Sequence, residues 1–188
     1  MKKVFFVSLL AVSIGLLSSF DLQAQTFKKG DGVFNATIGF GNARYSSGTT
    51  SSVPPIAVSY EVGVLDNVLE KGSIGIGGYL GYTSAKWDFG YGYSWKSTDI
   101  IIGARGVFHY PFVDKLDTYG GLMLAYDINS WKETGTSGFG SPTKSSYGGL
   151  IVPGFLGARY YFSEKFAGLA ELGWGIAYFN IGIALKVK

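Results

Sequence analysis

The sequence contains no cysteine, which excludes disulfide bridges, cysteine-based metal sites and a thiol nucleophile. Charged residues make up only 15% of the 188 residues, and the net charge of +3 is too small to indicate a nucleic-acid partner. Beyond the N-terminus, no apolar run approaches the ~20 residues that a membrane-crossing helix requires. We therefore expect neither covalent cross-links nor a transmembrane helix in the mature chain.

Glycine and aromatic residues are abundant. The chain has 29 glycines, a share of about twice average usage, together with 14 Phe, 13 Tyr and 4 Trp. Proline, by contrast, occurs only five times. This is the composition of an ordered chain, and the length indicates one domain.

The N-terminus has the pattern of an export signal. Lys2 and Lys3 precede an apolar stretch over residues 4–17, and Leu22-Gln23-Ala24 forms a plausible cleavage site. We expect a signal peptide over residues 1–24, export through the Sec pathway, and a mature domain over residues 25–188. The alternative is a retained single-helix anchor, which the short, serine-diluted apolar core disfavours.

The mature chain shows alternation of apolar and polar residues at period two, in segments separated by turn residues. Most of these segments approach the 9–11 residues that a tilted strand needs to cross a bilayer. The eight strands predicted in this way cover residues 32–43, 56–64, 73–86, 97–109, 118–131, 148–161, 167–175 and 178–187.

The two faces of the predicted strands differ in character, because neighbouring side chains on a strand point to opposite sides. One face is apolar in every strand, as in the series Phe34, Ala36, Ile38 and Phe40. The opposite face carries small residues and the following polar ones: Asn35, Thr37, Ser59, Glu61, Thr83, Asp99, Arg105, Asp127, Asn129, Arg159, Glu171, Asn180 and Lys186.

This polar face has too many glycines and too few charges to be the outer surface of a soluble barrel. In a membrane barrel the arrangement inverts, with apolar residues facing lipid and small or polar residues filling the lumen. We therefore predict an all-β, eight-stranded, antiparallel, up-and-down transmembrane β-barrel. Both termini and the connections at 65–72, 110–117 and 162–166 would be periplasmic. Those at 45–55, 87–96 and 132–147 would be external.

Three residues do not follow the pattern. Arg44 and Lys86 share the parity of the apolar face, and we place them at the membrane interface, where their strands end. Pro153 lies inside a predicted strand, where it removes a hydrogen-bond donor, and it predicts a β-bulge.

The stretch Gly157-Ala158-Arg159-Tyr160-Tyr161-Phe162-Ser163-Glu164-Lys165-Phe166, with Glu171-Leu172-Gly173-Trp174-Gly175 after it, resembles the closing strands of small outer-membrane barrels. These form the porin-like outer membrane protein β-barrel family, which shares its architecture with OmpA, OmpX and OmpW. The resemblance implies a bacterial outer-membrane location. The chain departs from many such proteins by ending in Val187-Lys188 instead of an aromatic residue.

Five charged residues are predicted to face the lumen: Glu61, Arg105, Arg159, Glu171 and Lys186. Charges at membrane depth are costly unless paired, so the first four predict an ion-pair network that Lys186 would join. The network either fills the lumen, which we favour, or gates a pore. If it is a gate, replacing Glu61 and Glu171 together by alanine would raise the conductance.

Five aromatic residues alternate across one predicted external loop: Trp87, Phe89, Tyr91, Tyr93 and Trp95. Such a stripe could bind a hydrophobic ligand, a glycan or a host surface. Alternatively, and in our preferred interpretation, it forms a hairpin above the membrane that packs on itself and on an upper girdle of aromatic residues. We expect this girdle to contain Phe40, Tyr82, Trp95, Tyr126 and Trp131.

The chain has one histidine, His109, so histidine-dependent catalysis would have to use it. Lipid A-modifying barrels resemble this chain in size but place a histidine near the external leaflet, whereas His109 is predicted as a periplasmic rim residue near Tyr110. We therefore expect no enzyme, catalytic residue, metal or cofactor. The predicted function is structural or surface interaction, by a monomer whose partners are outer-membrane lipid and an extracellular ligand. A narrow channel for small or apolar solutes is the alternative.

Overall fold

The computed structural model describes residues 27–44, 51–135 and 143–187, and the described part contains nine strands. Residues 1–26, which include the predicted signal peptide and its cleavage site, lie outside the described residues, as do 45–50 and 136–142. The strands are β1 (Gly32–Asn42), β2 (Ser51–Val68), β3 (Gly72–Asp88), β4 (Ser94–Val113), β5 (Leu116–Thr134), β6 (Lys144–Ile151), β7 (Gly154–Tyr161), β8 (Phe166–Gly173) and β9 (Ala177–Lys186).

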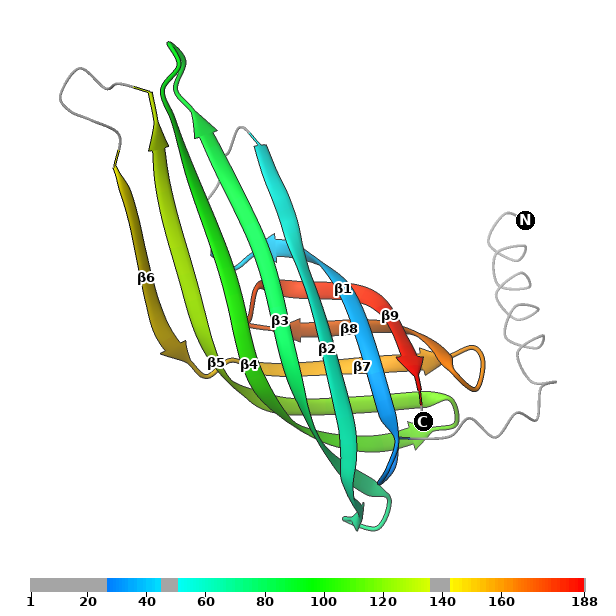
Figure 1. Ribbon diagram of the computed structural model, residues 1–188. Coiled ribbons are helices and arrows are strands. Elements are labelled where there is room, and N and C mark those ends of the chain that lie inside the picture. The colour runs from blue at the N-terminus through cyan, green and yellow to red at the C-terminus, as the bar shows by residue number, and fades with distance from the viewer. Residues whose placement is uncertain (1–26, 45–50, 136–142, 188) are drawn as a thin grey trace, which may run out of the picture.

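The strands form a closed antiparallel barrel. Each strand from β1 to β6 pairs with its neighbour in sequence, as do β7 to β9, and β1 also pairs with β9, which closes the ring. Both β6 and β7 pair with β5, one after the other, so that together they occupy one position in the ring. The predicted eight-stranded barrel is therefore confirmed (Figure 1).

Pro153 separates β6 from β7, but the predicted bulge is wrong. Ala125 faces Ile151 and Leu122 faces Gly154, which are three residues apart on both strands, so no extra residue is inserted. The Met123 N–H still bonds to the Pro153 carbonyl at 2.9 Å. Only the reciprocal bond is missing, because proline has no N–H, and the strand is interrupted without a change of register.

The predicted inversion of the two faces is confirmed. Apolar side chains of the outward face are exposed, as at Ile76 (56%) and Leu156 (68%). Polar side chains of the inward face are buried, as at Thr83 (0%) and Arg159 (1%). Among the described residues, no helix is long and apolar enough to cross a membrane.

The strands also wind around the barrel. The pairing row that passes through Gly148 on β6 runs through Ile128, Ile100, Tyr82, Ile56, Ile38, Ile181 and Ala170, and returns to the same ring position at Ala158. The return is displaced by 158 − 148 = 10 residues. Eight strands with this displacement tilt by roughly 40° from the barrel axis, which is the usual range for membrane barrels.

One side of the barrel is taller than the other (Figure 1). The pairing of β2 with β1 ends at Ile56, above which β2 pairs with β3 alone. Within the described residues, β6 pairs only with β5. Strands β2 to β6 thus continue as a five-stranded sheet with two free edges, which we call the extension. It accounts for the residues that β2, β4 and β5 add above their predicted bounds, and the same three strands also run past those bounds at the opposite end of the barrel.

Candidate functional site

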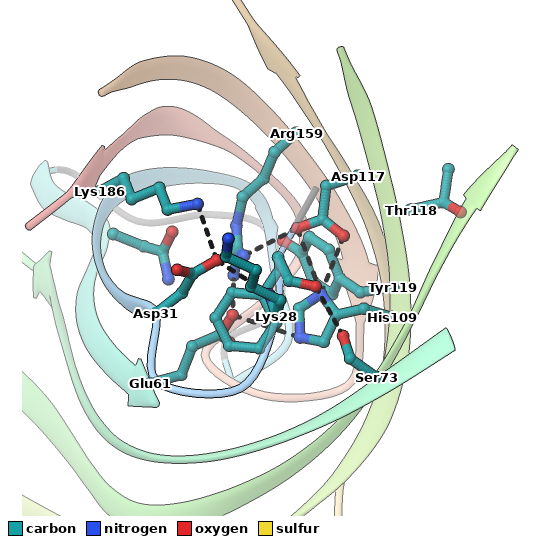
Figure 2. Close-up of polar contacts among 12 residues, drawn as sticks. Lys28, Asp31, Glu61, Ser73, His109, Asp117, Thr118, Tyr119, Arg159 and Lys186 are labelled. Carbon is teal, nitrogen blue, oxygen red and sulfur yellow. Dashed lines mark hydrogen bonds and ion pairs between the residues drawn. The ribbon is translucent and has the colours of Figure 1, made fainter. Parts of the chain in front are cut away.

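The lower part of the lumen holds a buried ion cluster centred on Arg159 of β7 (Figure 2). Its guanidinium lies 2.7 Å from Glu61 of β2 and 3.0 Å from Asp117 of β5. The side chains of all three residues are at most 2% exposed. Arg159 thus bridges two carboxylates from strands on different sides of the barrel, which ties the wall together through its interior.

His109 of β4 lies in the same cluster (Figure 2). Its Nδ1 is 2.9 Å from Asp117 and its Nε2 is 3.3 Å from Glu61. A neutral imidazole can donate to only one of these carboxylates, whereas an imidazolium donates to both. The interpretation of His109 as a rim residue near Tyr110 is wrong, because Asp117 and Glu61, one from each side of the lumen, draw the ring inward.

A floor segment, residues 27–31, covers this cluster from below. The Phe27 ring stacks on His109 at 4.1 Å between centroids, and the Ser73 hydroxyl donates to the Phe27 carbonyl at 2.8 Å. Lys186 pairs with Asp31 of this segment at 2.7 Å. The ion pair that the structure gives Lys186 is thus with Asp31, and not with the Arg and Glu residues of the predicted network. The cation holds the floor segment to the end of β9 instead.

A second ion pair lies farther along the lumen. Arg105 of β4 contacts Glu171 of β8 at 2.6 Å, and the Tyr119 hydroxyl donates to the same carboxylate at 3.1 Å. The Arg105 guanidinium lies over the Phe155 ring at 3.7 Å, while the Arg159 guanidinium lies over the Tyr119 ring at 4.6 Å. Tyr119 therefore separates the two ion clusters and contacts both.

The four residues predicted to form one network thus lie in two clusters, with Glu61 and Arg159 below and Arg105 and Glu171 above. Sequence reasoning missed Asp117, which falls in a predicted turn, and Asp31, which precedes the first strand. The alternation that places Arg159 on the lumen face also places Asp117 there, if the predicted fifth strand begins at residue 117 instead of 118.

Around the second ion pair, the lumen has little free space. Two cavities lined by residues such as Tyr79, Arg105 and Glu171 hold about 10 and 20 Å³, roughly the room of one water molecule each. Below them, Phe27 and the Arg159 cluster fill the barrel. Chemically, the arrangement stabilises charges at membrane depth and leaves no room for a substrate among these side chains.

The predicted aromatic stripe lies on the hairpin between β3 and β4, at the tip of the extension (Figure 1). Trp87 stacks on Trp131 at 5.8 Å, and Phe89 contacts Trp95 at 5.3 Å, with Tyr93 against both Phe89 and Trp95. These four rings of the stripe pack as the self-packing hairpin interpretation expects.

Tyr91 is the exception in the stripe, because it is fully exposed in a turn whose residues 90–92 all have positive φ.

Trp95 and Trp131 lie on the inward face of the extension, continuous with the lumen wall, and not in an outer girdle. Arg44, expected at the membrane interface, turns inward to Asp127 at 2.9 Å.

No protein-family model and no curated protein sequence matches the chain. Solved structures do match. One is Ail, the attachment invasion locus protein of Yersinia pestis, in complex with the heparin analogue sucrose octasulfate, with 13% identity and a TM-score of 0.51 over 83% of this chain and 93% of that one. A second structure of Ail has 12% identity and a TM-score of 0.49 over 84% and 95%. The chain thus has the fold of the small eight-stranded outer-membrane β-barrels.

Proposed function

We propose that this protein is a non-catalytic outer-membrane barrel that presents its extension at the cell surface to bind an extracellular ligand. The observation that carries the proposal is the contrast between a filled lumen and a projecting sheet. The ion clusters and the floor segment leave cavities of about 10 and 20 Å³, whereas β2 to β6 continue past the closed ring. In this proposal the termini are periplasmic and the protein acts as a monomer.

The apolar belt supports a membrane location for the closed part of the barrel. On β4, outward residues from Ile100 to Tyr110 are apolar or small, a span that matches the hydrocarbon thickness. Beyond Ile100 the outward residues are Thr98 and Lys96. At its β2 edge, where pairing with β1 ends at Ile56 in the same row as Ile100, the extension therefore begins where the hydrocarbon ends.

The aromatic hairpin is the part of the extension that we propose contacts the ligand. Phe89 is 53% exposed and Trp95 37% exposed, although both pack against neighbouring rings, and Tyr91 is fully exposed. Exposed aromatic faces of this kind suit the faces of sugar rings or apolar side chains of a partner. The similarity in fold to Ail, which was solved with a heparin analogue, makes glycans the first ligands to test.

A shortened hairpin tests this proposal. Lys86 and Lys96 face each other directly, so residues 87–95 can be replaced by Asn-Gly, which forms a two-residue hairpin turn. We expect the refolded wild-type protein to bind members of an array of neutral and sulfated glycans, and the shortened variant to lose that binding while its barrel remains folded. Binding that survives the deletion would contradict the assignment of the hairpin.

A further inference from the structure

A row of four lysines crosses the outward face of the extension. Lys86 of β3 faces Lys96 of β4, Lys96 faces Lys132 of β5, and Lys132 faces Lys144 of β6. The pairing is continuous from the membrane belt to this row, so the lysines share the face of Tyr82, Ile100 and Ile128. We call these four residues the lysine row.

The charge of the lysine row is mostly uncompensated. Lys96, Lys132 and Lys144 are exposed and form no ion pair with any residue that the structure describes. Lys86 contacts Asp88 at 3.4 Å, and the Gly90 N–H and Lys86 lower the pKa of that carboxyl, which therefore stays charged. Like charges placed directly opposite on a sheet destabilise it, so the row has a cost that an anion would remove.

A row of hydroxyl residues separates the lysine row from the apolar belt. Ser84, Thr98, Ser130 and Ser146 face one another on the same four strands, two residues from the lysines. The lysines lie four residues beyond Tyr82, Ile100 and Ile128, or ~13 Å along the strands, and roughly 9–10 Å above them for tilted strands. Flexible lysine side chains at this distance reach the headgroup region of the membrane.

The row also slopes, because the strands tilt. The displacement of ten residues around the ring places Lys144 higher than Lys86, by roughly 9 Å over the three strand steps. A slope of this size lets the row contact a headgroup at several depths. On the outward face of the described parts of β1, β7, β8 and β9, the positions above the belt carry no lysine, so this surface lies on one side of the barrel.

We propose that the lysine row and the hydroxyl row form a binding site for the phosphorylated sugar headgroup of an outer-leaflet glycolipid. The lysines pair with phosphates, while the hydroxyls of Thr98, Ser130 and Ser146, which are at least partly exposed, bond to sugar oxygens. Ser84 is only 4% exposed and does not contact the ligand. The apolar side chains directly below, such as Tyr82 and Ile100, contact the acyl chains of the same molecule. This continuity with the belt favours a lipid over a soluble anion. The site is separate from the aromatic hairpin, which the Asn-Gly variant removes while leaving Lys86 and Lys96 in place.

The test measures lipid binding by the refolded barrel in nanodiscs. A lipid A-type glycolipid, with its phosphates or enzymatically dephosphorylated, is added to a zwitterionic bilayer, and bound lipid is counted by native mass spectrometry. The test variant is Lys96→Gln/Lys132→Gln/Lys144→Gln. The matched control is Lys29→Gln/Lys71→Gln/Lys165→Gln, three exposed lysines at the opposite end of the barrel.

Each lysine near an anionic lipid surface contributes about fivefold to binding, so the test variant should bind the phosphorylated lipid about a hundredfold more weakly. The control variant should bind it like the wild type, and binding should weaken with added salt. Equal binding of phosphorylated and dephosphorylated lipid by the wild type would overturn the proposal without any mutation. The proposal would also be overturned if soluble heparin bound as tightly as the glycolipid and if this binding depended on the same lysines.

Discussion

At the scale of single residues, the lumen is organised by a few charges that cannot reach water. Arg159 contacts Glu61 and Asp117, and each of these carboxylates also faces a nitrogen of His109. Removing Arg159 leaves two buried carboxylates with His109 as their remaining shared partner in the cluster, which costs more than the cluster contributes when it is complete. The single and the combined substitutions should therefore behave differently.

Replacing Arg159 by methionine tests this directly. We expect the free energy of unfolding to fall by about 3–5 kcal/mol, because Glu61 and Asp117 lose their shared cation. The measurement is urea unfolding of the protein refolded into lipid vesicles. The combined variant Glu61→Gln/Asp117→Asn/Arg159→Met removes the charges together and should recover most of the loss. An Arg159→Met protein as stable as the wild type would show that the cluster is not coupled in this way.

Phe27 is the residue on which the floor segment depends. The change Phe27→Ala removes the ring that stacks on His109, so residues 27–31 should detach locally. We expect hydrogen exchange of the Gly63 N–H, which bonds to the Asp31 carbonyl, to accelerate by roughly tenfold or more. Leu69→Ala, an exposed residue in the turn at the same end, is the control and should leave this exchange unchanged. Unchanged protection in the Phe27 variant would contradict the role of the ring.

At the scale of elements, the interruption between β6 and β7 shows how a strand tolerates proline. The register stays continuous across Pro153, so the cost is one missing hydrogen bond and no displaced side chain. Because β6 pairs on one edge only within the described residues, the interruption lies where the closed ring gives way to the extension.

The change Pro153→Ala should therefore stabilise the barrel modestly. Alanine supplies an N–H that can donate to the carbonyl of Met123, the residue opposite. A hydrogen bond of this kind contributes about 0.5–1.5 kcal/mol. The measurement is again the free energy of unfolding, together with protection of the newly introduced backbone amide from hydrogen exchange. Pro55→Ala is the comparison and should show a smaller gain, because Pro55 lies in the register shift between Val53 and Ile56, where the pairing of β2 with β3 is already interrupted. Destabilisation by Pro153→Ala would imply that the proline holds a distorted geometry.

At the scale of the whole molecule, alternation along the strands predicts the barrel well, because a strand that faces the lumen on one side and lipid on the other must alternate at every position. The same alternation places Glu61, Arg105, Arg159 and Glu171 on the lumen face. It cannot show that Tyr119 divides them into two clusters, since the relative height of residues on different strands depends on the displacement around the ring.

Other features carry no periodic signal. Phe27 and Asp31 precede the first strand, so nothing in the pattern indicates that they fold back under the lumen. The pattern assigns the extension to loops because, beyond the hydrocarbon, both faces of a sheet can be polar, as at Lys132 and Glu133. The lysine row emerges only from pairing, which joins lysines that lie up to 58 positions apart in sequence (144 − 86).

The most direct test of the filled lumen is the planar-bilayer conductance of the refolded mature protein. We predict that the wild type shows no discrete channel openings, because the Arg159 cluster, the Arg105 and Glu171 pair and Phe27 occupy the barrel from wall to wall. The Glu61→Ala/Glu171→Ala variant serves as the comparison in which part of this filling is removed. Well-resolved, ion-selective openings of the wild-type protein would contradict a filled lumen and favour a narrow channel.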